Sequence, residues 1–270
     1  MPVHGEWIRF GDQTGYFAYP VHATQPLPSI LVIQELWGVE SQIIDTTRRL
    51  AAAGYAAYAP DLFAKGGTRP AVLTDERIAQ VQAFGASVPG GVWGDPAARD
   101  AALAQLPEPR RTEIRDTFTQ VSRMTGALPD FVKPLRDALK YLKHDRAETR
   151  GQAVGCVGFC MGGGLTALLA CEEPELGAGA IFYGSSPASE KTASIACPLI
   201  GFYGGNDSRI NAGVPVFDSA MKAAGKSFDC HIYEGANHAF FNEQNPRYDV
   251  KATRDSFVRL LSFFQKHLAT

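Results

Sequence analysis

Several features that mark special classes of protein are absent from this 270-residue sequence. It contains no run of ~18 apolar residues, the length that a membrane-spanning helix needs. Neither sign of charge dominates, because 26 Lys and Arg residues oppose 28 Asp and Glu residues, and nothing therefore indicates a nucleic-acid partner. The five cysteines are an odd number without a Cys-x-x-Cys pair, which predicts neither a zinc site nor a disulfide framework.

Motifs for targeting, metals and cofactors are also missing. The first residues, Met-Pro-Val-His-Gly-Glu-Trp, have neither the basic nor the apolar segment of a signal peptide, so we expect a cytoplasmic protein. No two histidines have the spacing of metal ligands on a helix, and no Gly-Lys-Ser or Gly-Lys-Thr ends a phosphate-binding loop. The sequence therefore predicts no metal, no cofactor and no membrane partner.

Short apolar runs alternate with helical patterns along most of the chain. Residues 30–33 are continuously apolar, which is typical of a strand buried on both faces. The repeated order of strand and helix predicts an α/β protein with a mostly parallel central sheet covered by helices. Strands are expected at residues 7–10, 14–19, 30–33, 55–59, 179–183, 198–203 and 228–233, and helices at 41–54, 131–143, 165–171, 214–224 and 254–268.

This alternation stops between residues 64 and 130. Asp95 followed by Pro96 is typical of a helix start, and apolar residues at i, i+4 and i+7 predict an amphipathic helix over 110–124. We expect helices without a strand here, as an insertion within one domain that spans residues 1–270. A structural helical layer and a lid over a substrate pocket are both open interpretations.

The most informative motif is Gly-Phe-Cys-Met-Gly at residues 158–162, between a strand pattern and a helical run. This is the pattern of a nucleophile elbow, which strains the backbone of its apical residue and leaves no space for side chains two positions before and after it. With cysteine in place of the usual serine, the pattern predicts that Cys160 is a thiol nucleophile.

Two other interpretations of this turn compete with the nucleophile elbow. Glycines at a strand-to-helix junction can serve close packing alone, and a cysteine is often an inert small apolar residue, which describes Cys156 better than Cys160. A dinucleotide-binding turn needs glycine at its first, third and sixth positions, but Cys160 occupies the third.

A catalytic thiol needs a base, and the base needs a group that orients it. His238 follows the last expected strand, and Asp207 follows the strand at 198–203. Both therefore lie beyond carboxyl ends of strands, where open α/β sheets bind ligands. A turn or a helix cap is the alternative role for Asp207. The chain order of nucleophile, acid and histidine is the order used by α/β-hydrolases.

Four stretches resemble the dienelactone hydrolases, also called carboxymethylenebutenolidases, a cysteine branch of the α/β-hydrolase fold. They are Gln-Glu-Leu-Trp-Gly at 34–38, Pro-Asp-Leu-Phe at 60–63, Gly-Phe-Cys-Met-Gly-Gly at 158–163 and Gly-Ala-Asn-His-Ala-Phe at 235–240. The resemblance implies a hydrolase that cleaves a small ester or lactone through an acyl-enzyme on the cysteine.

Three further residues complete the expected site. The backbone N–H of Met161, at the start of the elbow helix, is expected to bind the oxyanion. The resemblance implies the N–H of Leu36 as the second donor. It also implies that Glu35 contacts the resting thiol and takes part in forming the thiolate when substrate arrives. Because a buried carboxylate near a thiol should have a raised pKa, the two groups can exchange a proton.

The substrate is less closely defined than the chemistry. The best-known members of the family bind a substrate carboxylate with arginines, one of them four residues after the histidine, but Asn242 stands there in this chain. A broader esterase or lactonase, a thioesterase with the same triad, and a non-catalytic redox-sensing module in which Cys160 is only oxidised are the alternatives. Four arginines could replace the missing one: Arg69, Arg77, Arg209 and Arg247.

Overall fold

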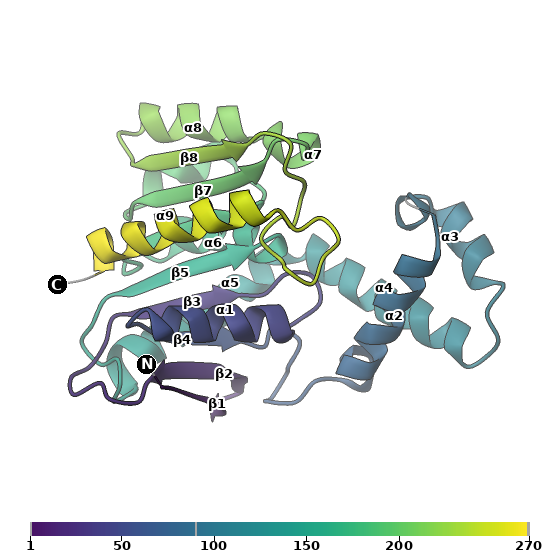
Figure 1. Cartoon of the computed structure of the whole chain (residues 1–270), viewed down its shortest axis with the longest axis horizontal. Helices are drawn as coiled ribbons and strands as arrows, with labels where there is room; N and C mark the ends of the chain where they lie inside the picture. Colours follow the sequence, from purple (N-terminus) through teal and green to yellow (C-terminus); the bar gives the residue numbers. More distant parts are fainter. Residues whose placement is uncertain (1, 90, 269–270) are drawn as a thin grey trace. The chain divides into compact units, whose positions relative to one another are not determined.

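The computed structural model describes residues 2–89 and 91–268 of the chain (Figure 1). Within them a single eight-stranded sheet has the order β1-β2-β4-β3-β5-β6-β7-β8. The strands from β4 to β8 in this order are parallel, whereas β1 and β2 run antiparallel to their neighbours. The strands are β1 Val3–Phe10, β2 Gln13–Pro20, β3 Ser29–Ile33, β4 Ala56–Pro60, β5 Val154–Phe159, β6 Ala178–Phe182, β7 Leu199–Gly204 and β8 Phe228–Tyr233.

Helices cover both faces of this sheet, as the continuously apolar strands require. Because side chains alternate along a strand, Ile30 and Val32 enter the core on one face of β3, and Leu31 and Ile33 enter the core on the other. The first core is shared with α1 (Ser41–Ala52) and α9 (Val250–Leu268). The second is shared with α5 (Val132–Lys140), α6 (Met161–Glu172) and α8 (Val214–Ala223). The predicted α/β architecture is therefore confirmed.

The ends of several elements differ from the expectations. Strand β1 begins at Val3, four residues earlier than expected, because its polar first half pairs with β2. Helix α6 begins directly at Met161 and includes three successive glycines, which intrinsic helix propensity disfavours. Helix α5 is regular only to Lys140, and a π-helical turn, Tyr141–Asp145, continues it.

The segment Phe63–Ala127 forms a compact unit separate from the one that contains the sheet. Its helices are α2 (Asp75–Ser87), α3 (Pro96–Leu103) and α4 (Arg110–Gly126), and its described residues contribute no strand to the sheet. The expected helix start is confirmed, since the Asp95 carboxylate accepts hydrogen bonds from the N–H groups of Ala97 and Ala98 at 2.9 and 3.3 Å. That this unit is an insertion in one domain, and that it acts as a lid, stay predictions.

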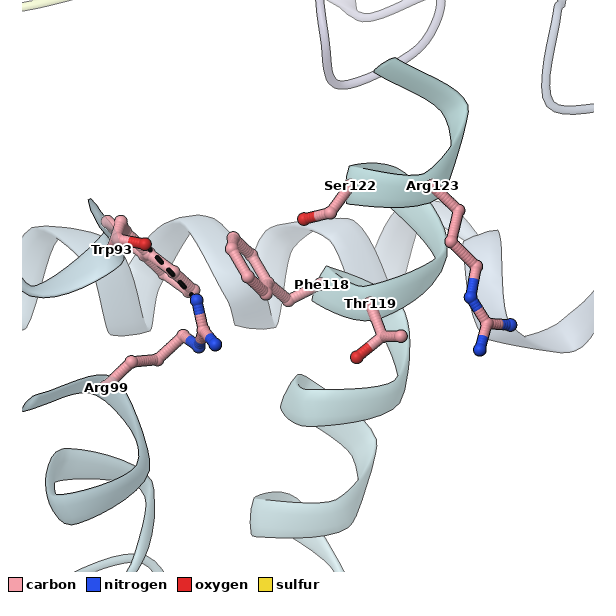
Figure 2. Close-up of a pocket in the computed structure, with 6 residues that line it drawn as sticks. All are labelled: Trp93, Arg99, Phe118, Thr119, Ser122 and Arg123. Atoms are coloured by element: carbon pink, nitrogen blue, oxygen red, sulfur yellow. Dashed lines mark hydrogen bonds between the residues drawn. The ribbon is translucent and has the colours of Figure 1, made fainter. Parts of the chain in front are cut away.

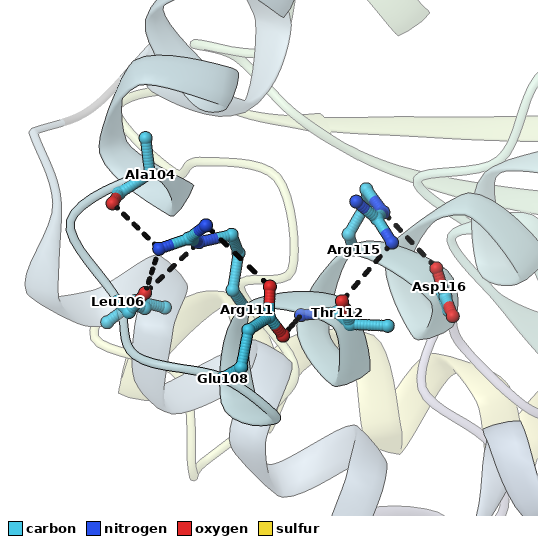
Figure 3. Close-up of polar contacts among 7 residues, drawn as sticks. All are labelled: Ala104, Leu106, Glu108, Arg111, Thr112, Arg115 and Asp116. Carbon is cyan, nitrogen blue, oxygen red and sulfur yellow. Dashed lines mark hydrogen bonds and ion pairs between the residues drawn. The ribbon is translucent and has the colours of Figure 1, made fainter.

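Aromatic stacking and arginine contacts join segments of this helical unit. Figure 2 shows Trp93 beside Phe118, with ring centres 4.4 Å apart, and the Arg99 guanidinium lies 4.8 Å from the Phe118 ring. From the first turn of α4, Arg111 donates to the carbonyl oxygens of Ala104 and Leu106, which precede the helix (Figure 3). These contacts are partly exposed.

Among the described helices, none is both long enough and apolar enough to cross a bilayer.

Candidate active site

The turn from β5 into α6 places Cys160 at a strained apex. Its backbone has φ 54° and ψ −112°, a conformation that costs energy for a residue with a side chain. A Cβ atom at Gly158 would overlap the Gly162 carbonyl group, and one at Gly162 would overlap the carbonyl oxygens of Ile33 and Gln34. The steric reason predicted for both glycines is therefore confirmed.

The thiol of Cys160 is held in its protonated form. Burial, and next the nearby Glu35 carboxylate, raise its pKa to about 12. A hydrogen bond from the Met161 backbone and the charge of Arg209 act in the opposite direction. The Met161 N–H thus lies beside the sulfur at the N-terminus of α6, where a helix favours negative charge. At neutral pH the free protein carries a thiol here, and a base must remove its proton.

Asp207 and His238 come together from the ends of β7 and β8. The Asp207 Oδ2 is hydrogen-bonded to Nδ1 of His238, while its Oδ1 accepts the N–H of Ile210 at 3.4 Å and so caps α7 (Ser208–Asn211). Both roles considered for Asp207, cap and histidine partner, therefore occur in one carboxylate. An Nδ1–H that donates to Asp207 leaves Nε2 of His238 as the proton acceptor.

The loops that carry these two residues are bonded to one another. The Asn206 side-chain amide donates to the Gly235 carbonyl oxygen at 2.9 Å, and the Asn206 N–H donates to the Ala236 carbonyl oxygen at 2.9 Å. The side chain of Asp207 is buried, whereas that of His238 keeps 21% of its surface exposed. The acid is fixed in the protein interior, and the imidazole can reach a bound molecule.

Glu35 lies buried two residues after the end of β3 and is held through both carboxylate oxygens. The Tyr183 hydroxyl donates to Oε1 and the Asn242 amide donates to Oε2, each at 2.9 Å. Burial raises the pKa of Glu35 above its ordinary value, although both hydrogen bonds act to lower it. Leu36 follows in a half-buried turn that a bridge between Glu35 and Gly38 closes.

Tyr183 is a site residue that the sequence did not reveal. It follows β6 directly, has φ 39°, and is fully buried with its ring 5.0 Å from that of His238. Burial and then Glu35 raise its pKa well above the ordinary value, so its hydroxyl keeps its proton and remains a donor. Its place at the carboxyl end of a parallel strand was the available signal, but the residue type alone suggested only a strand.

Asn242 has a different role from the arginine that it was compared with. It is buried, donates to Glu35, and accepts the N–H of Gln244 at 3.0 Å through Oδ1. Both of its polar atoms are therefore engaged inside the protein. Of the four candidate arginines, Arg209 has an electrostatic effect on Cys160, and Arg69 and Arg77 pair with Asp75 and Glu113 inside the helical unit.

All the predicted site residues of the sheet unit, and Tyr183 with them, therefore follow β3, β5, β6, β7 or β8 at the edge where parallel strands end. This sheet with its flanking helices has the α/β-hydrolase fold. A family model, the dienelactone hydrolase family, matches residues 14–268. The chain belongs to that family, as the resemblance implied, and it is a hydrolase.

Individual relatives agree with this placement. A Saccharolobus solfataricus protein named "Putative carboxymethylenebutenolidase" is 33% identical over 242 residues, which cover 89% of this chain and 90% of the relative. A Methylorubrum extorquens protein of the same name is 30% identical over 257 residues, covering 90% of this chain and 73% of the relative. A solved dienelactone hydrolase-like promiscuous phosphotriesterase from metagenomic libraries has a TM-score of 0.68 at 20% identity, with 99% of each chain covered, and shares the fold.

Proposed function

We propose that this hydrolase cleaves small esters or lactones through a Cys160–His238–Asp207 triad and an acyl-enzyme intermediate. One observation carries the proposal: the Asp207–His238 pair lies at the sheet edge where the strained elbow presents Cys160. A buried aspartate bonded to Nδ1 of a histidine is the arrangement that prepares Nε2 to act as a base. A cysteine held on an elbow between two obligatory glycines has a stereochemical purpose that an inert thiol would lack.

Acylation begins with proton transfer from the Cys160 thiol to Nε2 of His238. The sulfur then forms a bond to the carbonyl carbon, and the carbonyl electrons move to its oxygen. The N–H groups of Met161 and Leu36 stabilise this oxyanion, as the resemblance to the family implies. When the tetrahedral intermediate collapses, the C–O bond to the leaving group breaks and the imidazolium returns its proton to the departing alkoxide.

Deacylation repeats these steps with water. Nε2 of His238 takes a proton from the water, whose oxygen attacks the thioester carbonyl. Collapse of the second intermediate breaks the C–S bond, and the sulfur recovers the proton from the imidazolium. The free acid leaves, and Asp207 keeps its charge and its hydrogen bond to Nδ1 throughout.

Glu35 controls the resting state of the thiol. Its charge favours the protonated sulfur, which protects Cys160 from oxidation between turnovers. Tyr183 and Asn242 fix the carboxylate in that position by donating to both of its oxygens. Since burial raises the pKa of Glu35, its carboxylate can exchange a proton with the resting thiol, and His238 accepts the thiol proton in acylation.

The environment of residue 242 favours a substrate without a carboxylate at that side of the site. An arginine there could bind a substrate anion through two parallel hydrogen bonds, but Asn242 is neutral and is engaged with Glu35 and Gln244. Residue 242 therefore supplies no cation for the carboxylate of a dienelactone, and we propose neutral esters and lactones as the substrates. The acyl group of a thioester would meet the same nucleophile.

The test is hydrolysis of p-nitrophenyl acetate, dihydrocoumarin, a dienelactone and an acyl thioester by the wild type, Cys160→Ala and His238→Gln. We expect the two neutral oxygen esters to be preferred and every activity to be lost in both variants. Mass spectrometry after rapid acid quench should find one acetyl group on the Cys160 peptide. Full turnover by Cys160→Ala would contradict the mechanism, and a preference for the dienelactone would contradict the substrate class only.

A further inference from the structure

A cavity of about 510 Å³ opens on the helical unit, beside α3, α4 and the short turn Val92–Gly94 (Figure 2). This volume lies within the range of about 300–1,000 Å³ that is typical of small-molecule sites. Aromatic side chains and two arginines line the cavity, and its described lining contains no acidic group. All of these residues belong to the helical unit and not to the proposed catalytic site. The cavity therefore has the chemistry to bind an anion with an apolar body.

The aromatic wall of the cavity is fixed by contacts on several sides. The Trp93 ring stacks on Phe118 with ring centres 4.4 Å apart, and Phe84 meets it edge-on at 5.6 Å. A Cβ atom at residue 85 would lie only 2.5 Å from Nε1 of Trp93, so Gly85 gives the indole its place against α2. A wall that is already in position costs less conformational entropy when a ligand binds.

The two arginines that line the cavity, Arg99 and Arg123, differ from most other arginines of the helical unit. The others pair with acids in the contacts Arg69–Asp75, Arg77–Glu113, Arg111–Glu108 and Arg115–Asp116. Among the described residues, neither Arg99 nor Arg123 has an acidic partner. Their charges are therefore not neutralised, and they raise the local affinity for an anion.

Arg99 and Arg123 present different binding groups. The Arg99 guanidinium lies 4.8 Å from the centre of the Phe118 ring, and its Nη1 donates to the Trp93 carbonyl oxygen at 3.3 Å. It is thus held as a planar group, and such a group stacks on aromatic rings. The side chain of Arg123 makes no hydrogen bond within the described residues, so its guanidinium N–H groups can bind a carboxylate. Figure 2 shows the two guanidinium groups well apart, on either side of Phe118 and Thr119.

We propose that this cavity binds an aromatic carboxylate. The ring packs against Arg99, Phe118 and Trp93, and the carboxylate accepts charge-assisted hydrogen bonds from the Arg123 guanidinium. Because the two arginines lie well apart (Figure 2), a molecule with a ring at one end and a carboxylate at the other contacts both, whereas a small inorganic anion contacts only one. This binding is separate from the proposed ester hydrolysis.

The first test is calorimetric titration of the full chain with 1-naphthylacetate. We expect saturable binding at one site with a dissociation constant below ~1 mM, a value within reach of a ligand of this size. Two matched ligands separate the contributions, since 1-naphthylacetamide keeps the ring without the charge and octanoate keeps the charge without a ring. Each should bind more weakly than 1-naphthylacetate by about tenfold or more.

Three variants, each verified as folded by circular dichroism, locate the binding site. Arg123→Gln removes the cation that receives the carboxylate and should weaken binding by about tenfold or more. Arg99→Lys keeps the charge but loses the planar group, and should weaken binding about fivefold. Arg110→Gln is the control, because Arg110 is exposed at the start of α4, has no acidic partner among the described residues and does not line the cavity. It should change the affinity by less than about twofold.

Three results would overturn the proposal. The first is the absence of saturable binding up to ~5 mM 1-naphthylacetate, a concentration that would populate even a weak specific site. The second is binding that Arg123→Gln and Arg99→Lys leave unchanged, which would place the ligand elsewhere in the protein. The third is equal affinity for 1-naphthylacetamide, which would remove the role of the anion. Hydrolysis of p-nitrophenyl acetate is measured separately, so failure of this site is distinguishable from failure of the proposed function.

Discussion

The sheet unit and the helical unit differ in where they hold unfavourable backbone conformations. Within the described residues, the three non-glycine residues with positive φ are Cys160, Tyr183 and Ala239, and all three follow strands of the sheet unit. In the helical unit positive φ occurs at glycines only, among the residues that the structure describes. Strained non-glycine residues persist where surrounding contacts fix them, and they concentrate at functional sites. The comparison is consistent with the proposal that the chemistry belongs to the sheet unit.

Removal of the thiol should give the largest difference between the two units. Cys160→Ala is expected to lower kcat/KM for p-nitrophenyl acetate by about 10³-fold or more, because no other group can form the acyl-enzyme. In the helical unit, Ser122→Ala is the matched small change at an exposed position, and it should leave kcat/KM within about twofold. Equal rates for the two variants would remove the chemical distinction between the units.

The second largest difference is expected in thiol reactivity. The Cys160 thiol should react with a different pH dependence from an exposed cysteine in the helical unit. The pKa of Cys160 is about 12 instead of the ordinary 9.0, so its thiolate fraction, and hence its labelling by iodoacetamide, should keep rising with pH well beyond pH 9. Ser122→Cys on α4 provides an exposed reference, whose labelling should level off near the ordinary value. Mass spectrometry of the two peptides across pH 7–11 measures both curves.

The raised pKa of Cys160 predicts the direction of two further effects, one on labelling and one on stability. Since the Glu35 carboxylate helps to raise the pKa of Cys160, Glu35→Gln should lower that pKa and speed labelling at pH 8. The folded state binds the thiol proton more tightly than the unfolded state, so this group's contribution to stability is lost as pH rises from 9 towards 12. Slower labelling in Glu35→Gln would show that Glu35 acts on the thiol in another way.

A glycine replacement should distinguish backbone contacts in the two units. Gly162→Ala places a Cβ against the Ile33 carbonyl and is expected to cost about 3 kcal/mol of unfolding free energy or more, with loss of activity. Gly126→Ala at the end of α4 meets no atom within 4 Å, and should change stability by less than about 1 kcal/mol. Urea unfolding of both variants provides the comparison.

Substitution of a buried polar side chain should lower stability in both units but lower activity in the sheet unit only. Asn242→Ala leaves an oxygen of Glu35 without its donor, so we expect about 1–3 kcal/mol of destabilisation and a kcat reduced about tenfold. Thr117 is the counterpart in the helical unit, where its hydroxyl donates to the Val72 carbonyl at 2.8 Å. Thr117→Ala should destabilise by a similar amount and leave kcat unchanged. Thermal unfolding and initial rates report the two quantities separately.

The smallest effect is expected from an exposed ion pair of the helical unit. Arg115 contacts Asp116 and Thr112 at the surface (Figure 3). Exposed pairs contribute little because water and salt screen them, so Arg115→Gln should change stability by less than about 0.5 kcal/mol. A loss of several times this amount in urea unfolding would show that the helical unit depends on charge pairs more than its packing suggests.

The sequence predicted those parts of the site that depend on local pattern. The elbow at Cys160 and the positions of Asp207 and His238 after strands follow from spacing and turn residues alone. The start of α6 was misplaced because its three glycines are poor helix formers in isolation, whereas close backbone packing requires them. Tertiary packing, and not intrinsic helix propensity, therefore determines where α6 begins.

Contacts between residues far apart in the sequence account for the site residues that the sequence did not predict. Tyr183 and Asn242 acquire their roles only through Glu35, which is 148 and 207 residues away in the chain. A tyrosine at a strand end and an asparagine in a loop have many possible partners, and no spacing rule connects them to a particular carboxylate. For the same reason Asn242 was compared with a substrate-binding arginine although it serves the protein interior.

The tight contact of α6 with the strand next to it affects how the catalytic centre tolerates sequence change. At Gly162 the closest neighbours are the carbonyl groups of Ile33 and Gln34 at the end of β3, not side chains. The height of the elbow above the sheet is therefore set by main-chain atoms, which every sequence shares. Side chains around the elbow can then be exchanged, by evolution or in the laboratory, without displacing Cys160. A hydrolase built in this way can acquire new substrates while its reaction chemistry stays the same.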